Sequence, residues 1–304
     1  SGFRSIEIPR GKILGGSSSI NGMVFVRGQS QDYDHWAQLG NKGWSYEDIL
    51  PYFKKMETYK GPKSAYRGQT GPLIVTDPME SNPFYAAMFK GAEEIGIKRN
   101  PDYNAAQQDG VGMTQATIWR GKRQSTAVSY LHPIKKRKNL RILTDTYVEK
   151  LILQNNKCVG VETTQKGTTV VVRSNCEVII SAGAINSPQL LELSGIGAEN
   201  VLRKAGIEVK SALPGVGENL RDHYAPRMKW STLKGRYTYN DRARGIGMAL
   251  EIAKYFTAGS GFLAMPAAPM RAYVRSREGL SAPDLGISVN PFLIKRGVSL
   301  DKSS

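Results

Sequence analysis

A glycine-rich segment near the start of the chain constrains the fold more than any other feature. Residues 11–24 have the sequence GKILGGSSSINGMV. Glycine loses more conformational freedom on folding than other residues, so a folded domain keeps such a run where backbone N–H groups must come close to a ligand. The segment therefore predicts a site for a tightly held anionic or planar cofactor. A plain surface loop is the alternative, because short glycine motifs also occur by chance.

A second segment, residues 178–197, has the pattern of a strand, a turn of small residues and a helix. The apolar run at 178–182 predicts a buried strand. Ser187 is the expected N-cap of the following helix, with Pro188 at its first position, and the helix should end at Ser194-Gly195. Helix N-termini placed this way often bind phosphates, because the free N–H groups and the helix dipole favour negative charge. An ordinary structural turn would show the same pattern.

Taken in this order, the two segments resemble the signature motifs of the glucose-methanol-choline (GMC) oxidoreductase family, the flavin-dependent alcohol oxidases and dehydrogenases. The choline dehydrogenase-like and aliphatic alcohol dehydrogenase branches are the most similar. Further matches follow in the family's order at residues 32–36 (DYDHW), 43–53 (GWSYEDILPYF), 121–133 (GKRQSTAVSYLHP) and 214–223 (PGVGENLRDH).

The resemblance assigns contacts with FAD to particular residues. Backbone contacts with the cofactor are implied at Ile13, Gly15, Gly16 and Ser17. The stretch expected to lie against the flavin ring is Asn21, Gly22, Met23 and Val24. The main chain of Val148 matches the position that meets the adenine, although any core strand would show an apolar residue there. Relatives with a covalent flavin carry a histidine directly before this asparagine; Ile20 cannot form that bond, so non-covalent FAD is implied.

Two features of the family are not found in this sequence. Members begin with a strand, a Gly-x-Gly-x-x-Gly turn and a helix that bind the FAD pyrophosphate, and they carry a catalytic histidine in a later segment. The three histidines here, His35, His132 and His223, fall in motifs that are structural or adjacent to the cofactor. We therefore assign no catalytic residue, and we expect an internal fragment that is inactive on its own.

The succession of patterns predicts a mixed α/β fold. Helices are expected around 49–56 with Ser45 as N-cap, at 84–96 and at 198–205; strands are expected at 114–119, 141–143, 147–153, 159–164, 168–172, 178–180 and 285–293. The resemblance implies an incomplete FAD-binding domain of the GMC type, formed by residues 1–30 and 131–225. It also implies a substrate cap built on an antiparallel sheet, formed by residues 31–130 and 226–304.

Composition agrees with a packed enzyme fold. At 304 residues and 40% hydrophobic content, the chain can bury two cores or one large interrupted core. It has no run approaching the ~20 apolar residues of a membrane-spanning helix. The two cysteines, Cys158 and Cys176, indicate neither a disulfide framework nor a metal site, and both are expected in the core. The cellular compartment stays open.

The chain is strongly basic, with 42 Lys and Arg against 26 Asp and Glu, a formal net charge of +16. Such an excess can attract nucleic acid or an anionic membrane surface. The basic residues are scattered, however, and no nucleic-acid-binding motif accompanies them. We therefore expect no nucleic-acid partner, whereas peripheral membrane contact through the basic surface stays open. A solvated basic face is the simplest interpretation.

The reaction implied by the resemblance is oxidation of a primary alcohol to an aldehyde, with hydride transfer to N5 of the flavin. A quaternary ammonium substrate would need aromatic faces or a carboxylate nearby. The cap segment 259–273 contains no acidic residue, which favours a neutral, apolar alcohol over choline. A flavin-binding homologue without enzymatic activity is an alternative, and a basic nucleic-acid-binding module is a weaker one. The electron acceptor is not indicated.

Overall fold

The computed structural model describes residues 7–78, 80–230, 238–292, 294–295 and 299–300. The chain forms two compact units. Unit 1 comprises Ser1–Arg137 and Lys229–Ser304, and unit 2 comprises Lys138–Met228. The limits of unit 2 lie close to the segment 131–225, while residues 7–30 belong to unit 1. The assignment of four segments to an FAD-binding domain and a cap domain stays a prediction.

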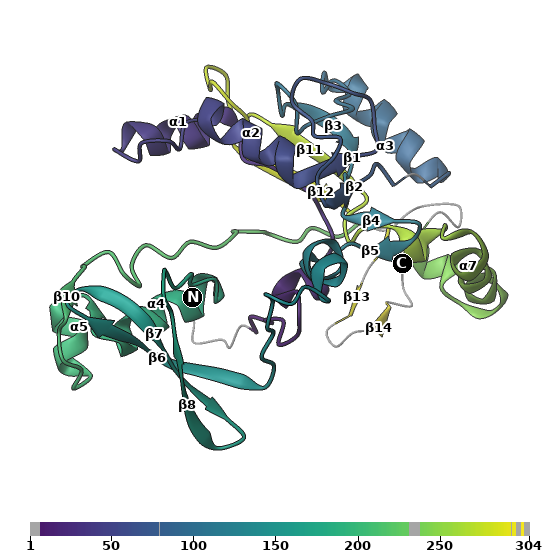
Figure 1. The fold of residues 1–304 in the computed structure, drawn as a ribbon. Coiled ribbons are helices and arrows are strands. Elements are labelled where there is room, and N and C mark those ends of the chain that lie inside the picture. The colour runs from purple at the N-terminus through teal and green to yellow at the C-terminus, as the bar shows by residue number, and fades with distance from the viewer. Residues whose placement is uncertain (1–6, 79, 231–237, 293, 296–298, 301–304) are drawn as a thin grey trace. The chain divides into compact units, whose positions relative to one another are not determined.

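Unit 1 is built around an antiparallel sheet with the strand order β12-β11-β3 (Figure 1). Its strands are β3 (Gly110–Met113), β11 (Met270–Val274) and β12 (Leu285–Val289). Helix α3 (Pro83–Glu94) packs on this sheet, because its Tyr85 joins Val111 and Met270 in one buried cluster. An antiparallel sheet in this part of the chain agrees with the expected cap.

The sequence-based strands of unit 1 were too long. Within 114–119, only Ile118–Trp119 is a strand, and Ala116 forms isolated bridges. The N–H of Thr114 instead donates to the carbonyl of Pro269 at 2.8 Å. The strand expected at 285–293 ends at Val289, and Leu293 lies outside the described residues.

Short elements complete unit 1. The paired strands are parallel β1 (Glu57–Tyr59) and β2 (Leu73–Val75), antiparallel β4 (Ile118–Trp119) and β5 (Lys122–Arg123), and antiparallel β13 (Ile294–Lys295) and β14 (Ser299–Leu300). The helices are η1 (Gly16–Ser19), α1 (Ser30–Gln38), α2 (Tyr46–Met56), the π-helix η2 (Ala127–Leu131), η3 (His132–Ile134), α6 (Tyr239–Arg242), α7 (Gly245–Ala258) and η4 (Phe262–Ala264). Ser45 caps α2 as predicted, because its hydroxyl accepts the N–H of Asp48.

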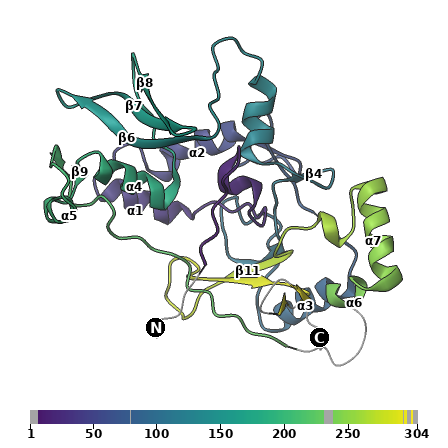
Figure 2. The ribbon, with the colours of Figure 1, turned by 90° about the horizontal axis from the view of Figure 1, so that it is seen from below.

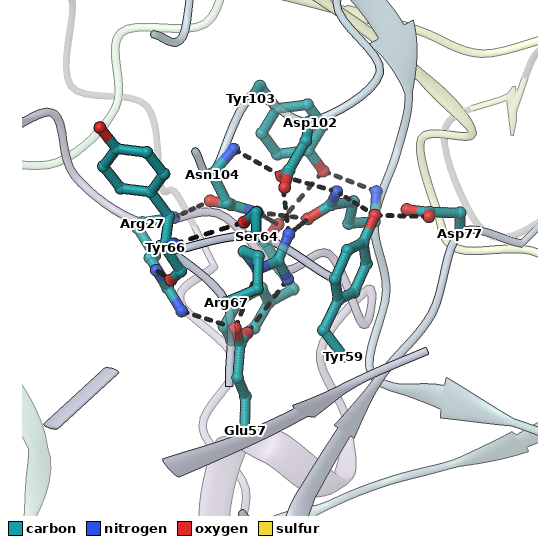
Figure 3. A network of polar contacts seen from close by, with 12 residues as sticks. Arg27, Glu57, Tyr59, Ser64, Tyr66, Arg67, Asp77, Asp102, Tyr103 and Asn104 are labelled. Atoms are coloured by element: carbon teal, nitrogen blue, oxygen red, sulfur yellow. Dashed lines mark hydrogen bonds and ion pairs between the residues drawn. The ribbon is translucent and has the colours of Figure 1, made fainter. Parts of the chain in front are cut away.

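A buried ionic network lies beside the core of unit 1 (Figure 3). Glu57 accepts hydrogen bonds from Arg27 at 2.7 Å and from Arg67 at 2.8 Å. Arg67 also reaches Asp102 at 2.7 Å, and the side chains of Glu57 and Arg67 are fully buried. Because Arg27 lies three residues after Val24, this network fixes the chain just beyond the stretch 21–24.

Unit 2 contains an antiparallel meander, β6 (Thr146–Gln154), β7 (Lys157–Gln165) and β8 (Thr168–Arg173). The predicted turns are confirmed: Asn155 and Asn156 have φ of 48° and 61°, and Lys166 and Gly167 have φ of 49° and 80°. Two successive positive φ angles suit a two-residue hairpin, because they match the strand twist. Helix α4 (Gly183–Leu193) packs on β6, and β9 (Ile196–Gly197), α5 (Glu199–Lys204) and β10 (Ser211–Ala212) follow.

Several expectations for unit 2 were wrong. Residues 178–180 do not form a strand, and Ile179 is 78% exposed; no described strand pairs with them, and a buried strand needs hydrogen-bonded neighbours. Residues 141–143 are likewise exposed and outside any strand. Cys158 is half-buried and Cys176 is exposed, so Cys176 is not a core residue.

The start of α4 also differs from the prediction. The helix begins at Gly183, so Ser187 and Pro188 lie inside it. The Ser187 hydroxyl accepts the N–H of Ala182 at 3.0 Å, which closes the turn before the helix instead of capping a later one. The predicted end is confirmed, because Ser194 is the C-cap and Gly195 has φ of 87°.

Candidate cofactor site

The double glycine of residues 11–24 requires glycine for two different reasons. Both residues have positive φ, 89° at Gly15 and 54° at Gly16. A Cβ at Gly15 would lie 2.5 Å from the Ser19 hydroxyl, so this position is closely packed. A Cβ at Gly16 would meet nothing within 4 Å. Gly15 is therefore required for the close packing of the loop against its neighbours. Gly16 instead exposes its backbone to open space.

The hydroxyls of the loop hold it to residues far along the chain. Ser18 donates to the carbonyl of Gly15 at 2.5 Å, and its oxygen accepts the N–H of Thr126 at 2.9 Å. The Thr126 hydroxyl donates to the same Gly15 carbonyl at 3.2 Å. Ser18, the neighbour of the predicted cofactor contact Ser17, thus serves to shape the loop.

Arg123 joins the glycine loop to the stretch that follows it. Its Nη1 donates to the carbonyl of Ser18 at 3.2 Å and to the carbonyl and side-chain oxygens of Asn21, both at 2.7 Å. One guanidinium therefore holds the end of η1 and the start of the stretch 21–24 together. Arg123 and Thr126 both belong to the 121–133 motif.

Residues 21–24 form a strained, well-anchored bend. Met23 has φ of 62°, rare for a residue other than glycine, and its N–H donates to the Asn21 side chain at 3.0 Å. A Cβ at Gly22 would lie 2.7 Å from the Cβ of Ala267, and Val24 bridges to Ala116. Such strain persists only where surrounding contacts enforce it, and it is common at ligand sites.

In unit 2, Val148 lies at a β-bulge. Val148 pairs with Thr163 and Lys150 pairs with Glu162, so Glu149 is the extra residue on β6. A bulge leaves backbone groups outside the ladder and free for other partners. This end of β6 lines a cavity of ≈ 300 Å³ together with the segment 178–182 and four side chains of α4, namely Asn186, Gln189, Leu190 and Leu193. The structure therefore brings Val148 and the second sequence motif to one cavity.

These features fit a nucleotide cofactor. Among the described residues, the N–H groups of Gly15 and Ser17 donate to no protein acceptor. Together with the open space at Gly16, they form the kind of backbone concavity that binds phosphate groups. The Ile13 side chain is 62% exposed and packs into no core, so any contact it makes with a ligand is at the loop surface. The cavity in unit 2 is lined mainly by apolar side chains, as a planar base requires.

Sequence reasoning missed three residues of this site, namely Arg123, Thr126 and Ala267. Arg123 and Thr126 lie in the 121–133 motif, in which the sequence indicated no particular contact. Ala267 gave no signal, because its importance comes from its contact with Gly22. Within the described part of the chain, no group of three or more His, Cys, Asp or Glu residues lies where it could hold a metal ion. In the same part of the chain, no helix is both long and apolar enough to cross a bilayer.

The fold is that of a mixed α/β protein, and its glycine loop fits a nucleotide cofactor. A family model described as GMC oxidoreductase matches residues 2–225. The chain belongs to this family, and the family resemblance inferred from the motifs is confirmed.

Curated relatives include oxygen-dependent choline dehydrogenases. The protein from Sinorhizobium fredii is 41% identical over 295 residues, which cover 96% of this chain and 53% of the relative. The protein from Sinorhizobium medicae is 48% identical over 220 residues, which cover 72% of this chain and 40% of the relative. The chain thus spans about half the length of the curated relatives it matches.

Solved structures agree on the fold. An FAD-dependent oxidoreductase from Chaetomium thermophilum has a TM-score of 0.83 at 28% identity, covering 89% of this chain and 50% of that one. Formate oxidase from Aspergillus oryzae has a TM-score of 0.77 at 26% identity, covering 88% and 48%. The α/β fold class is confirmed, and the family and these neighbours support FAD as the cofactor.

Proposed function

We propose that the protein containing this chain oxidises a primary alcohol to an aldehyde with non-covalently bound FAD. The observation that carries the proposal is the glycine loop, where Gly16 faces open space beside the N–H groups of Gly15 and Ser17, which donate to no acceptor among the described residues. The chain's membership of the GMC family supports the same flavin-dependent oxidation. The chain's own residues supply binding and orientation, and we assign none of them to proton transfer.

When bound, FAD would accept the hydride of the alcohol carbon at its N5. Gly15, Gly16, Ser17 and the backbone of Ile13 would hold the cofactor, and residues Asn21–Val24 would lie against the flavin ring. Val148 would meet the adenine. Arg123 keeps Asn21 and the loop in one geometry, so the cofactor would meet a preformed surface. Preorganisation of this kind reduces the ordering cost of binding.

The glycine assignment can be tested with a matched pair of variants. Gly16 and Gly96 both have positive φ, 54° and 83°, and a Cβ at either would meet nothing within 4 Å. Alanine should therefore cost a similar ~1–2 kcal/mol of backbone strain at each position. Only Gly16→Ala should lower the flavin content of the purified complete protein, measured per protein from the visible spectrum. Equal flavin content in the two variants would contradict the proposal.

Non-covalent attachment rests on Ile20, a half-exposed side chain directly before Asn21 that cannot bond to a flavin. Acid precipitation of the complete protein should release the yellow chromophore into the supernatant. Flavin that stays with the pellet would show a covalent bond elsewhere.

The substrate is proposed to be a neutral, apolar alcohol, although the relatives above are named for choline. The segment that contacts the flavin-facing stretch through Ala267 is part of residues 259–273, which carry no carboxylate. A quaternary ammonium would therefore lack a counter-charge from this segment. Turnover of hexanol should exceed turnover of choline in the complete protein. A clear preference for choline would reverse the substrate assignment and leave the cofactor assignment intact.

A further inference from the structure

Helix α7 (Gly245–Ala258) has the reverse of the polarity expected of a surface helix. Its two charged residues are Glu251 and Lys254, and Glu251 is 2% exposed. Three of its large apolar residues face outward, with Ile246 81% exposed, Leu250 57% and Phe256 80%, whereas Met248 and Tyr255 are half-buried. Surface helices of soluble proteins place their apolar stripe against the core. Here the stripe at spacing i, i+4, i+10 is turned away from unit 1.

This orientation is fixed by buried polar contacts. Glu251 pairs with Arg242 on α6, with Lys254 at 3.0 Å, and with the N–H of Phe262 at 3.1 Å. Arg242 also pairs with Glu80 on the segment before α3. Glu251 is thus anchored inward while Lys254 stays half-exposed, and rotating the apolar stripe into unit 1 would break the contacts of Glu251. In both ribbon views, α7 lies at the periphery of unit 1 (Figure 1, Figure 2).

Basic side chains border the C-terminal end of the helix. The β4–β5 hairpin touches it there, since a Cβ at Gly121 would lie 2.9 Å from the Cα of Gly259. The residues on either side of Gly121, Arg120 and Lys122, are exposed. Lys60 and Arg120 lie 5.2 Å and 5.6 Å from the ring centre of Trp119. An apolar helix face with a border of cations and a tryptophan is the composition of an interfacial membrane helix.

We propose that α7 and the β4–β5 hairpin tip form a membrane-contact surface that lies on an anionic bilayer. The apolar stripe would enter the headgroup boundary, while Arg120 and Lys122 would meet lipid phosphates. Charge favours a bilayer over a second copy of the chain. A symmetric pairing on this face would bring two identical basic borders together, whereas an anionic leaflet attracts them. The net charge of +16 acts in the same direction.

The test is co-sedimentation of the complete, flavin-loaded protein with vesicles of phosphatidylcholine alone or mixed with phosphatidylglycerol. We expect binding to the anionic vesicles only, weakened by salt. Phe256→Ser should reduce the partition coefficient by about tenfold, from the loss of one buried aromatic side chain. The double variant Arg120→Glu and Lys122→Glu should reduce it by at least about twentyfold, since each basic residue contributes about fivefold.

Two controls match these variants. Ile95→Ser removes an apolar side chain that is 74% exposed elsewhere in unit 1, and Lys135→Glu with Lys136→Glu makes the same change of net charge outside this surface. Neither control should lower binding more than about twofold, because neither position touches the proposed surface. Absence of binding to anionic vesicles would overturn the proposal, as would equal losses in variants and controls. A dimer in sedimentation velocity that Phe256→Ser dissociates, without vesicle binding, would assign the face to self-association instead.

Discussion

At the scale of single residues, Arg123 connects the glycine loop to the stretch 21–24, which we propose lies against the flavin. Its three hydrogen bonds to Ser18 and Asn21 join segments distant in sequence, and hydrogen bonds made by a charged group contribute about 1.5–3 kcal/mol each. We predict that Arg123→Met lowers the affinity of the apoprotein for FAD by at least about tenfold, because the loop loses its preformed geometry. Titration with FAD, followed by flavin fluorescence, measures this.

A lysine at the same position separates positioning from bulk charge. Arg123→Lys keeps the charge but carries it as a more strongly hydrated ammonium on a flexible stem, so it should recover only part of the affinity. Arg99→Met removes an exposed guanidinium paired with Glu93 and serves as the control. Unchanged FAD affinity in Arg123→Met would show that the loop does not need this clamp.

The buried carboxylate of Glu57 gives a prediction for stability. Glu57→Gln leaves Arg27 and Arg67 buried without their shared counter-charge, which should cost about 3–5 kcal/mol. The urea midpoint should fall accordingly. Glu93→Gln breaks only an exposed pair and should change stability by less than about 1 kcal/mol. Similar midpoints for the two variants would mean that the network does not stabilise the fold.

Sequence alone could predict some of these residues and not others. Gly15, Gly16 and Asn21 belong to a pattern whose backbone requirements are local, so the glycine loop was found. Arg27, Glu57 and Arg67 look like ordinary surface charges, because their burial depends on contacts between segments distant in sequence. Ala267 is likewise defined only by its neighbour Gly22.

At the scale of elements, locally encoded features were predicted well. The two hairpin turns of the meander and the Ser45 cap depend on residues within a few positions, and each occurs where expected. The strand at 178–180 was wrong, because a strand is completed by its hydrogen-bonded neighbours and none is described beside it. The start of α4 was also wrong, since Gly183 can begin the helix earlier than the Ser187-Pro188 signal suggested.

The contacts of Glu251 that hold α7 in place should make the stability of the protein depend on pH. Burial opposes ionisation of Glu251, but hydrogen bonds from Arg242, Lys254 and the Phe262 N–H outweigh it and hold the pKa of its carboxyl below the usual 4.5. A carboxylate with a lowered folded-state pKa contributes stability that is present above its ordinary pKa and lost as the pH falls through the lowered value.

We therefore predict that Glu251→Gln destabilises the protein by about 1–3 kcal/mol at neutral pH, and that this difference shrinks below pH 4.5. Urea unfolding of variant and parent across the acid range measures it. Glu94→Gln, at an exposed pair with Lys90, should show no such convergence. A difference independent of pH would assign the contribution of Glu251 to packing instead of charge.

At the scale of the whole molecule, the family assignment and the cofactor chemistry are supported from separate directions. The order of motifs indicated the GMC family before the fold was described, and the family model and the fold neighbours agree. What the motifs could not supply is the geometry within each unit, such as the clamp by Arg123 and the bulge beside Val148. Those features arise only when segments distant in sequence fold together.

The most direct test of the central claim is reduction of the flavin by an alcohol without oxygen. The complete protein should be yellow as purified, and anaerobic addition of hexanol should bleach the visible flavin absorption while an aldehyde forms in equal amount. A colourless protein that takes up no FAD, or a bound flavin that neither hexanol nor choline reduces, would contradict the account.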